Sequence, residues 1–406
     1  MNRLRDENAA RRAVVSVMGR FHAFDLAREL DRRGRLERLF TSYPASLLPR
    51  FGVDASRGTT SPWIEVSARA MRRVAPERAA ALAPWFAARY DRFVALALRE
   101  GAGVFVGWSG QCLASLRRAR DLGMRTIVER GSAHIVAQHE ILSEEFARHG
   151  IRPALPHPAI VERELAEYEY ADFVQVPSRF ALRTFVERGV PHEKLLVNPY
   201  GVDLRAFSPA EREPRGFVVL FCGRASVQKG VAHLVRAFEA FDAPDAELWI
   251  QGAVEPDAES VRANCRDPRV KWLGHSPQHE LPQVYRRAHV LCLPSIQDGF
   301  GLVVPQAMAC GLPAIVSTNA GASDLVRDGV DGFTVPPADA ASITASLEAL
   351  YSDRDLLRTM SLAARERVDS GWSWEDYGRR AAALLDHVLD RSDAPSDVEL
   401  GVRRAS

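Results

Sequence analysis

The chain has 406 residues, which is enough for two domains of ordinary size. Its formal net charge of +1 excludes an overall field that would favour nucleic acid or an anionic membrane. No apolar run approaches the ~18 residues of a membrane span, and residues 1–12 are polar and rich in Arg, unlike a signal peptide. The five cysteines show no C-x-x-C spacing, which indicates free thiols. We therefore expect a cytoplasmic protein that binds no nucleic acid.

Strands and helices are expected to alternate through the first half of the chain. Ala13–Met18 is predicted to be a buried strand, followed by a turn at Gly19 and a helix that ends near Arg33. This alternation predicts a parallel sheet with helices on both faces and ligands beyond the carboxyl ends of its strands. Further strands are expected at 103–108, 125–129 and 173–177, and helices at 111–122, up to 170, and at 178–189.

The segment from Trp63 to Glu100 is less regular than its neighbours. It mixes arginines with Trp85, Phe86 and Tyr90, and we predict a helical insertion. A basic amphipathic helix of this kind suits an acceptor or lipid headgroups. A solvated insertion with an ordinary apolar face is the alternative that we favour.

The second half opens with a predicted strand, Phe217–Cys222, and a loop that contains Gly223, Arg224 and Lys229. Two cations beside a loop at a strand end suit the charge that develops on a departing diphosphate. Because the chain has only three lysines, we favour a functional role for Lys229 over a chance surface charge. More strands are expected at 246–251, 269–274, 289–293 and 314–317, and helices at 231–241, 280–288, 338–352, 353–369 and 372–389.

The strongest motif is Pro294–Gly311, which reads P-S-I-Q-D-G-F-G-L-V-V-P-Q-A-M-A-C-G. A predicted strand precedes it, and it ends in a short predicted helix, Gln306–Cys310. A strand, a glycine loop and a helix in this order direct backbone N–H groups at one spot, which suits a phosphate group. Asp298 in the loop and Gln306 in the helix are placed to reach a ligand held there.

This motif resembles the signature of the retaining glycosyltransferases of family 4, which have the GT-B architecture. The family signature reads Glu-Gly-Phe-Gly-Leu, with a second Glu eight residues after the first and then Ala-Met-Ala-x-Gly-x-Pro-Val. Here Asp298 and Gln306 replace the two Glu residues, whereas the Gly-Phe-Gly-Leu and Ala-Met-Ala positions match. Residues 223–230 resemble the family's Gly-Arg-x-x-x-x-Lys-Gly. Residues 194–209 resemble its passage between domains, with Tyr200 where Asn is usual.

The resemblance implies a role for each candidate residue. The donor diphosphate would be bound by Arg224, Lys229 and the backbone of Gly299, Phe300, Gly301 and Leu302. Asp298 would bind sugar hydroxyls and Gln306 the ribose. From the first domain, Gly19 would approach the sugar or phosphate, and His134 would face the donor sugar, so that His134 and Asp298 are the predicted catalytic residues. An ordinary tight turn at Gly19, a hydrogen-bonded loop histidine at 134, and a structural pair between Glu129 and Arg130 are the alternatives.

The resemblance also implies an α/β fold of two Rossmann-like domains that face a central cleft. Residues 1–204 would form the acceptor-side domain, 205–215 a linker and hinge, and 216–371 the donor-side domain. Residues 372–390 would form a helix that packs back on the first domain, and 391–406 a polar tail. No metal or cofactor is expected, and the Cys and His residues show no metal-ligand spacing.

The predicted function is that of a retaining hexosyltransferase in bacterial glycan or polysaccharide biosynthesis. It would move a sugar from a nucleoside-diphosphate sugar to a hydroxyl of a glycan or lipid-linked acceptor, with at most peripheral contact with the inner face of the membrane. Because both signature Glu residues are replaced, a non-catalytic GT-B protein that binds nucleotide sugars or partners an active transferase is the alternative. An epimerase or phosphorylase is disfavoured, since no lysine is placed to hold pyridoxal phosphate.

Overall fold

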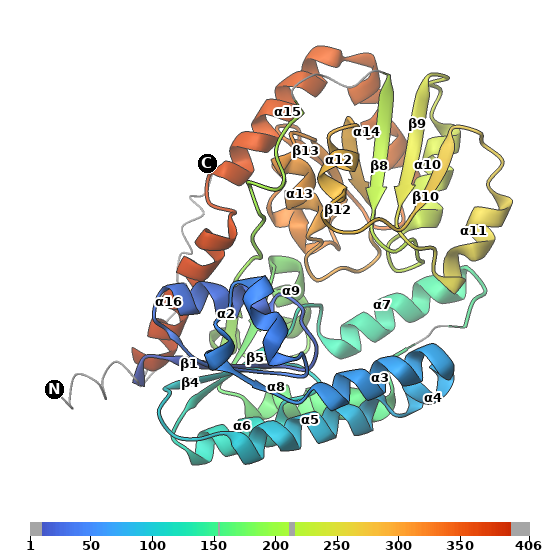
Figure 1. Cartoon of the computed structure of the whole chain (residues 1–406). Coiled ribbons are helices and arrows are strands. Elements are labelled where there is room, and N and C mark those ends of the chain that lie inside the picture. Colours follow the sequence, from blue (N-terminus) through green and yellow to red (C-terminus); the bar gives the residue numbers. More distant parts are fainter. Residues whose placement is uncertain (1–9, 153–154, 211–215, 391–406) are drawn as a thin grey trace.

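The computed structural model describes residues 10–152, 155–210 and 216–390, and these form two α/β units, each built on one sheet (Figure 1). The first sheet has seven strands in the order β3-β2-β1-β4-β5-β6-β7, and the second has six in the order β10-β9-β8-β11-β12-β13. All of the strand pairs in the described ranges are parallel. Part of the predicted linker (211–215) and the predicted tail (391–406) lie outside these ranges.

The strands of the first sheet surround the central pair β1 and β4, both of which are fully buried. Their apolar sequences, A-V-V-S-V and V-F-V-G-W, are those expected of strands that helices cover on both faces. The strands are β1 (Ala13–Val17), β2 (Leu36–Thr41), β3 (Gly58–Thr60), β4 (Val104–Trp108), β5 (Arg125–Glu129), β6 (Phe173–Val176) and β7 (Leu195–Val197). The helices are α2 (Ala23–Arg32), α3 (Pro62–Val74), α4 (Pro76–Ala81), α5 (Ala83–Ala97), α6 (Leu113–Asp121), α7 (Ile135–Arg148), α8 (Pro158–Tyr170) and α9 (Arg179–Val186).

The second sheet is centred on β8, a run of six buried residues. Its strands are β8 (Phe217–Cys222), β9 (Ala246–Gln251), β10 (Val270–Gly274), β11 (Val290–Leu293), β12 (Ala314–Ser317) and β13 (Gly332–Val335). The helices of this half are α10 (Val231–Ala240), α11 (Glu259–Asn264), α12 (Leu281–Tyr285), α13 (Val303–Ala309), α14 (Ala340–Ser352), α15 (Arg354–Asp369) and α16 (Trp374–Asp390). Short 3₁₀ helices lie at Ala45–Phe51, Ala55–Arg57, His192–Lys194, Pro256–Ala258 and Gly321–Asp324.

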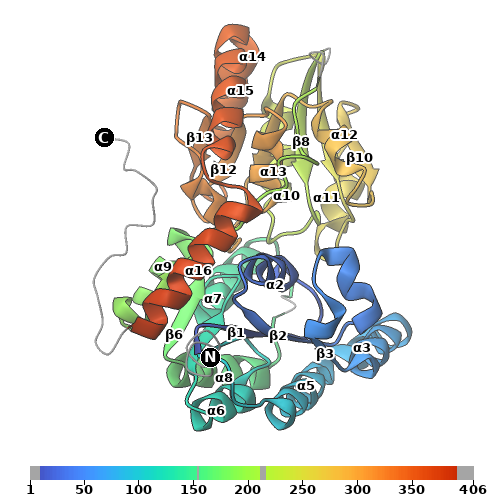
Figure 2. The ribbon, with the colours of Figure 1, turned by 60° about the vertical axis from the view of Figure 1, so that its left-hand side comes forward.

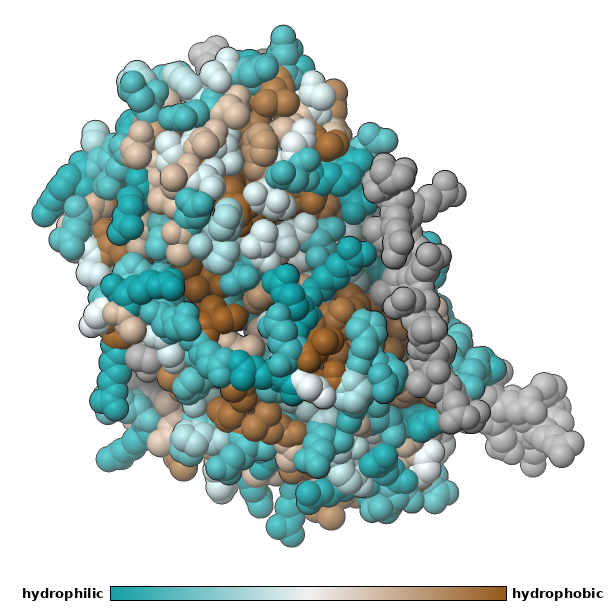
Figure 3. All heavy atoms as spheres, turned by 180° about the vertical axis from the view of Figure 1, so that it is seen from behind, coloured by the Kyte–Doolittle hydropathy of each residue, from teal (hydrophilic) through white to brown (hydrophobic). Residues whose placement is uncertain are grey.

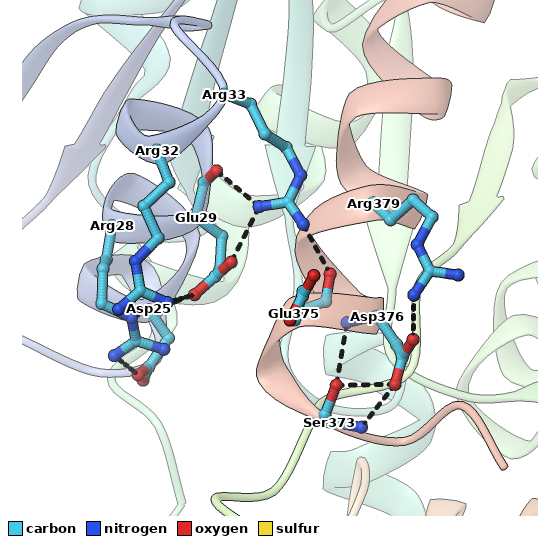
Figure 4. Close-up of polar contacts among 9 residues, drawn as sticks. All are labelled: Asp25, Arg28, Glu29, Arg32, Arg33, Ser373, Glu375, Asp376 and Arg379. Atoms are coloured by element: carbon cyan, nitrogen blue, oxygen red, sulfur yellow. Dashed lines mark hydrogen bonds and ion pairs between the residues drawn. The ribbon is translucent and has the colours of Figure 1, made fainter.

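The last helix, α16, leaves the second unit and runs along the first, where it packs against α2 (Figures 1 and 2). Gly378 makes this packing possible, because a Cβ atom there would lie 2.4 Å from Cβ of Glu29. The Glu29 side chain is buried and is held by Arg28, Arg32 and Arg33. Arg33 also donates to the carbonyl oxygen of Glu375 at 2.8 Å, which joins the two helices (Figure 4).

Several elements differ from those expected from the sequence. The strands β2, β3 and β7 were not predicted, because Glu37 and Arg38 interrupt the apolar run L-E-R-L-F-T of β2, and β3 and β7 have only 3 residues each. The helix α13 begins at Val303, three residues before the predicted start. Pro305 lies in its first turn, where the N–H group that proline lacks would have no partner within the helix.

The molecular surface carries separate small hydrophobic patches among hydrophilic residues on the face seen in Figure 3. The exposed large hydrophobic side chains include Trp63 on α3 and Trp85 on α5, which are 46% and 49% exposed. Arg89 lies over both indole rings. Within the described ranges, no helix combines the length and the apolar character that a membrane span requires.

Candidate functional site

A cavity of about 200 Å³ lies where the two halves meet. Most of its wall comes from the carboxyl ends of β8 and β11 and from the loop before α13, which is the edge where parallel sheets bind ligands. The first half contributes Gly131 and Tyr200. The other lining residues are Cys222, Gly223, Lys229, Leu293, Asp298, Phe300, Gly301, Leu302 and Val303.

A wider hollow of about 560 Å³ lies elsewhere, between residues 239–244 and 267–269. These residues end α10 and precede β9 and β10, so the hollow is at the amino ends of these two strands. Its wall contains none of the candidate residues. The smaller cavity is therefore the candidate site.

The structure brings the two predicted loops of the second half together. The Lys229 ammonium group and the Asp298 carboxylate form an ion pair, and their side chains are 21% and 15% exposed. Beside them, Gln228 donates to the carbonyl oxygen of Gln297 at 3.1 Å, and Ile296 N–H donates to the carbonyl oxygen of Gln228 at 2.9 Å. One cation and one anion thus lie side by side on the wall of the cavity.

Glycines allow the two halves to touch at this point. A Cβ atom on Gly299 would lie 2.2 Å from the carbonyl oxygen of Gly131, so any larger residue would separate the halves. Ser178 donates from its hydroxyl to the carbonyl oxygen of Gly299 at 2.8 Å. Gln297 donates to the hydroxyl of Ser132 at 2.9 Å. The glycine loop is therefore held directly by the first half.

Behind the wall from the first half, Tyr200 contacts a buried carboxylate that the sequence motifs did not single out as a site residue. Glu129, at the end of β5, is fully buried and lies 3.0 Å from Nε2 of His22. The Tyr200 hydroxyl donates to the same carboxylate at 3.2 Å, and Gln175 also donates to it. Burial and the nearby carboxylate raise the pKa of Tyr200 well above its ordinary value, so its hydroxyl keeps its proton. The sequence does mark position 200 as unusual, because Tyr200 stands where the family motif usually has Asn.

Arg130 does not pair with Glu129, which corrects one alternative drawn from the sequence. Its guanidinium group contacts Glu164 at 2.9 Å and the carbonyl oxygen of Ala133 at 3.0 Å. These contacts fix the backbone that leads from Gly131, at the cavity, to α7.

His134 lies at the amino end of α7, and the described residues that line the cavity do not include it. Its Nδ1 accepts a hydrogen bond from Val136 N–H at 3.3 Å. The ring packs against Tyr168 and Phe185 and is buried. Burial, with the positive charges of Arg130 and Arg188, lowers the pKa of His134 to about 4. This geometry favours the hydrogen-bonded loop histidine, and the role facing the sugar stays a prediction.

Four further candidates, among them Gly299, are not among the described residues that line the cavity. Arg224 is 72% exposed, with its guanidinium group 3.6 Å from Glu255. Gln306 accepts a hydrogen bond from the buried Tyr285 hydroxyl at 3.2 Å. Gly19 has a φ of +94°, and its N–H donates to Ser42, so a tight turn accounts for glycine there.

The second half of the chain matches a known protein family. Residues 216–353 match the family model described as glycosyl transferases group 1. The D-inositol 3-phosphate glycosyltransferase of Nocardia farcinica is 32% identical over 242 residues, which cover 53% of this chain and 53% of that protein. A GDP-mannose-dependent monoacylated alpha-(1-6)-phosphatidylinositol monomannoside mannosyltransferase of Corynebacterium glutamicum is 29% identical over 236 residues, covering 53% and 62%. The chain spans about half the length of the curated relatives it matches.

Solved structures resemble nearly the whole chain. Sucrose-phosphate synthase from Thermosynechococcus elongatus has a TM-score of 0.71 and 21% identity, over 93% of this chain and 99% of that one. Anabaena Alr3699/HepE in complex with UDP and glucose has a TM-score of 0.67 and 16% identity, over 93% and 99%. The two parallel sheets facing one another have the GT-B architecture, and the predicted fold class is confirmed.

Proposed function

We propose that this chain is a retaining glycosyltransferase that uses a nucleoside-diphosphate sugar. The observation that carries the proposal is the meeting of Lys229 and Asp298 on the wall of a cavity between two GT-B halves. The match of residues 216–353 to glycosyl transferases group 1 supports it. The names of the relatives, which include glycosyltransferases and mannosyltransferases, favour a hexose as the transferred sugar.

In the proposed reaction, the bond between the anomeric carbon and the diphosphate breaks while an acceptor hydroxyl bonds to that carbon on the same face and gives its proton to an oxygen of the departing diphosphate. Lys229 and the backbone N–H groups of Gly299 to Leu302 stabilise the negative charge on the departing diphosphate. Asp298 accepts hydrogen bonds from sugar hydroxyls, and Gln306 from the ribose. Arg224 is exposed in this structure and reaches the diphosphate by a change of rotamer. No metal takes part in this proposal.

The donor requires more room than the cavity offers. Its volume of about 200 Å³ is below the roughly 300–1,000 Å³ that is typical of small-molecule sites. The contact of Gly299 with Gly131 closes the cavity from the first half. We therefore propose that the two halves separate to admit the donor and then close over it, which excludes water from the reaction.

A panel of UDP-, GDP- and ADP-sugars tests this function. We expect one nucleotide class to raise the melting temperature with increasing concentration, because a ligand that binds only the folded state stabilises it by mass action. The same donor should then lose its sugar to an acceptor or, slowly, to water. A panel in which every donor leaves the melting temperature unchanged would contradict the proposal.

A non-catalytic nucleotide-sugar-binding protein is the second candidate. It is favoured by one observation, namely that Asp298 and Gln306 stand where the family signature has two Glu residues. Such a protein would show the same thermal shift, yet neither transfer nor hydrolysis of any donor. A turnover assay with the same donors therefore distinguishes the two candidate functions.

A further inference from the structure

A cluster of three ligand-type side chains joins the two halves outside the cavity. Glu145 lies on α7 of the first half and His149 is the C-cap of that helix, whereas His233 lies on α10 of the second half. The Glu145 Oε1 atom lies 3.0 Å from Nε2 of His149 and 2.6 Å from Nε2 of His233. One donor atom from each of the three residues lies within 4.8 Å of the other two.

The packing of α7 explains why these residues meet. Glu145 and His149 are four residues apart on a helix and its C-cap, so they share one face. On the same side, Leu142 and Phe146 pack with Val227, a residue of the loop that carries Lys229. In Figure 1, α7 lies between the two sheets, below α10 and α11. The cluster therefore spans the contact between the halves.

The donor set is one that first-row transition metals prefer. Imidazole nitrogens and a carboxylate oxygen bind Zn²⁺, with bond lengths of about 2.0–2.2 Å. Both Nε2 atoms already lie within 3.0 Å of the same Glu145 oxygen, so movements of the three side chains would bring the donor atoms around one ion. Glu145 is 1% exposed and the His233 side chain is 9% exposed, so two of the ligands are shielded from water.

The surroundings suit a metal ion that keeps one coordination position for a water molecule. The His149 side chain is 21% exposed, which provides an entry path and room for a water molecule as the fourth ligand. Arg148 holds the other oxygen of Glu145 at 3.0 Å, an outer contact of the kind that orients ligating carboxylates. The Arg148 side chain is 63% exposed and can rotate as the ion enters.

We propose that Glu145, His149 and His233 form a binding site for a divalent transition metal of the Zn²⁺ class, which ties α7 to α10. The described residues that line the cavity include none of the three, so the site is separate from the proposed transfer chemistry. His233 lies in the first turn of α10, directly after the loop with Lys229 and Gly230. Metal bound there holds that loop against the first half and favours the closed arrangement.

Calorimetric titration of Zn²⁺ into the chelator-treated full-length protein tests the site. We expect one saturable site, and a loss of at least 100-fold in affinity in both His233→Gln and His149→Gln. The exposed His279, whose side chain is 82% exposed, supplies the matched control, and His279→Gln should bind as the wild type does. If His233→Gln does not fold, His149→Gln still tests the site, because the His149 side chain is partly exposed.

The melting temperature tests whether the bound metal joins the two halves. Zn²⁺ should raise the melting temperature of the wild type and of His279→Gln, and leave that of His149→Gln unchanged. Saturable binding that survives both His149→Gln and His233→Gln would assign the metal to other histidines and overturn the proposal. Absence of saturable binding of both Zn²⁺ and Co²⁺ would overturn it as well.

Discussion

Lys229 and Asp298 are 69 residues apart in the chain, and their side chains form an ion pair on the wall of the cavity between the halves. In this arrangement each charge is the counter-ion of the other. A bound diphosphate would compete with Asp298 for the Lys229 ammonium group. Neutralising Asp298 should therefore preserve or strengthen nucleotide binding but weaken sugar transfer.

Asp298→Asn should leave the affinity for a nucleoside diphosphate unchanged or make it tighter, because Lys229 no longer has a carboxylate partner. Transfer should fall by about 10–100-fold, since a charge-assisted hydrogen bond to a sugar hydroxyl is worth about 1.5–3 kcal/mol. Calorimetry with the diphosphate and a turnover assay measure the two effects. Weaker diphosphate binding with unchanged turnover would contradict the role given to Asp298.

Gln306→Glu should preserve or improve transfer. The carboxylate still accepts the hydrogen bond from Tyr285, and its charge strengthens a bond to a ribose hydroxyl by about 1 kcal/mol, which is about fivefold in affinity. Tyr285→Phe serves as the control, because it removes the protein partner of Gln306 without adding charge. A Gln306→Glu variant that binds nucleoside diphosphate more weakly than the wild type would argue against a ribose contact.

Gly378→Ala should destabilise the protein, although alanine is normally the better helix former by about 1 kcal/mol. The new Cβ atom would lie 2.4 Å from Cβ of Glu29, and overpacking of this kind costs typically 1–3 kcal/mol. Ala383→Ser adds one heavy atom to an exposed position of the same helix and should change stability by less than about 0.5 kcal/mol. A melting temperature in Gly378→Ala that equals or exceeds the wild-type value would refute close docking of α16 on α2.

His134→Asn should flatten the dependence of stability on pH between about 4 and 6.5. The folded-state pKa of about 4 lies below the ordinary value of 6.5, so the unfolded chain binds more protons in this window and stability falls as the pH falls. The loss in the wild type amounts to about 3 kcal/mol by pH 4. Asparagine keeps an acceptor for the amino end of α7 but does not titrate. Denaturant melts at several pH values measure the slope.

The same variant separates the two roles considered for His134. If His134 only caps the helix, the rate of sugar transfer by His134→Asn should be within about threefold of the wild-type rate, because Asn can replace the hydrogen bond to Val136. A residue that faces the donor sugar predicts the loss of 10²–10⁴-fold that is typical of an acid–base group. His279→Asn, at an exposed position, should change neither the pH slope nor turnover.

Several strands could be predicted from the sequence because they are apolar runs with few or no polar residues, such as β1, β4, β8 and β11. Phe217–Cys222 is one example, and its predicted bounds match β8. The strand β2 escaped prediction because two charged residues interrupt it, although one of them, Glu37, pairs with Arg12 at 3.1 Å. The local pattern thus identified buried strands such as β8 and missed β2, β3 and β7, which lie toward the edges of the first sheet.

Within the site, the sequence identified residues carried by motifs and missed those assembled from distant segments. The approach of Lys229 to Asp298 was expected from two glycine loops at strand ends. The cluster of His22, Glu129 and Tyr200 draws on three separate segments, so no spacing in the sequence reveals it. The same reason hid the proximity of His233 to Glu145, since the two lie on different halves.

Lys229 is the cation proposed to bind the donor diphosphate, and the proposed mechanism requires it. The measurement that tests it is the affinity of the preferred nucleoside diphosphate for Lys229→Ala, compared with Lys271→Ala, whose exposed lysine lies on β10. We predict a loss of at least tenfold in affinity, with transfer abolished, for Lys229→Ala and wild-type values for Lys271→Ala. Wild-type affinity and turnover in Lys229→Ala would contradict the account.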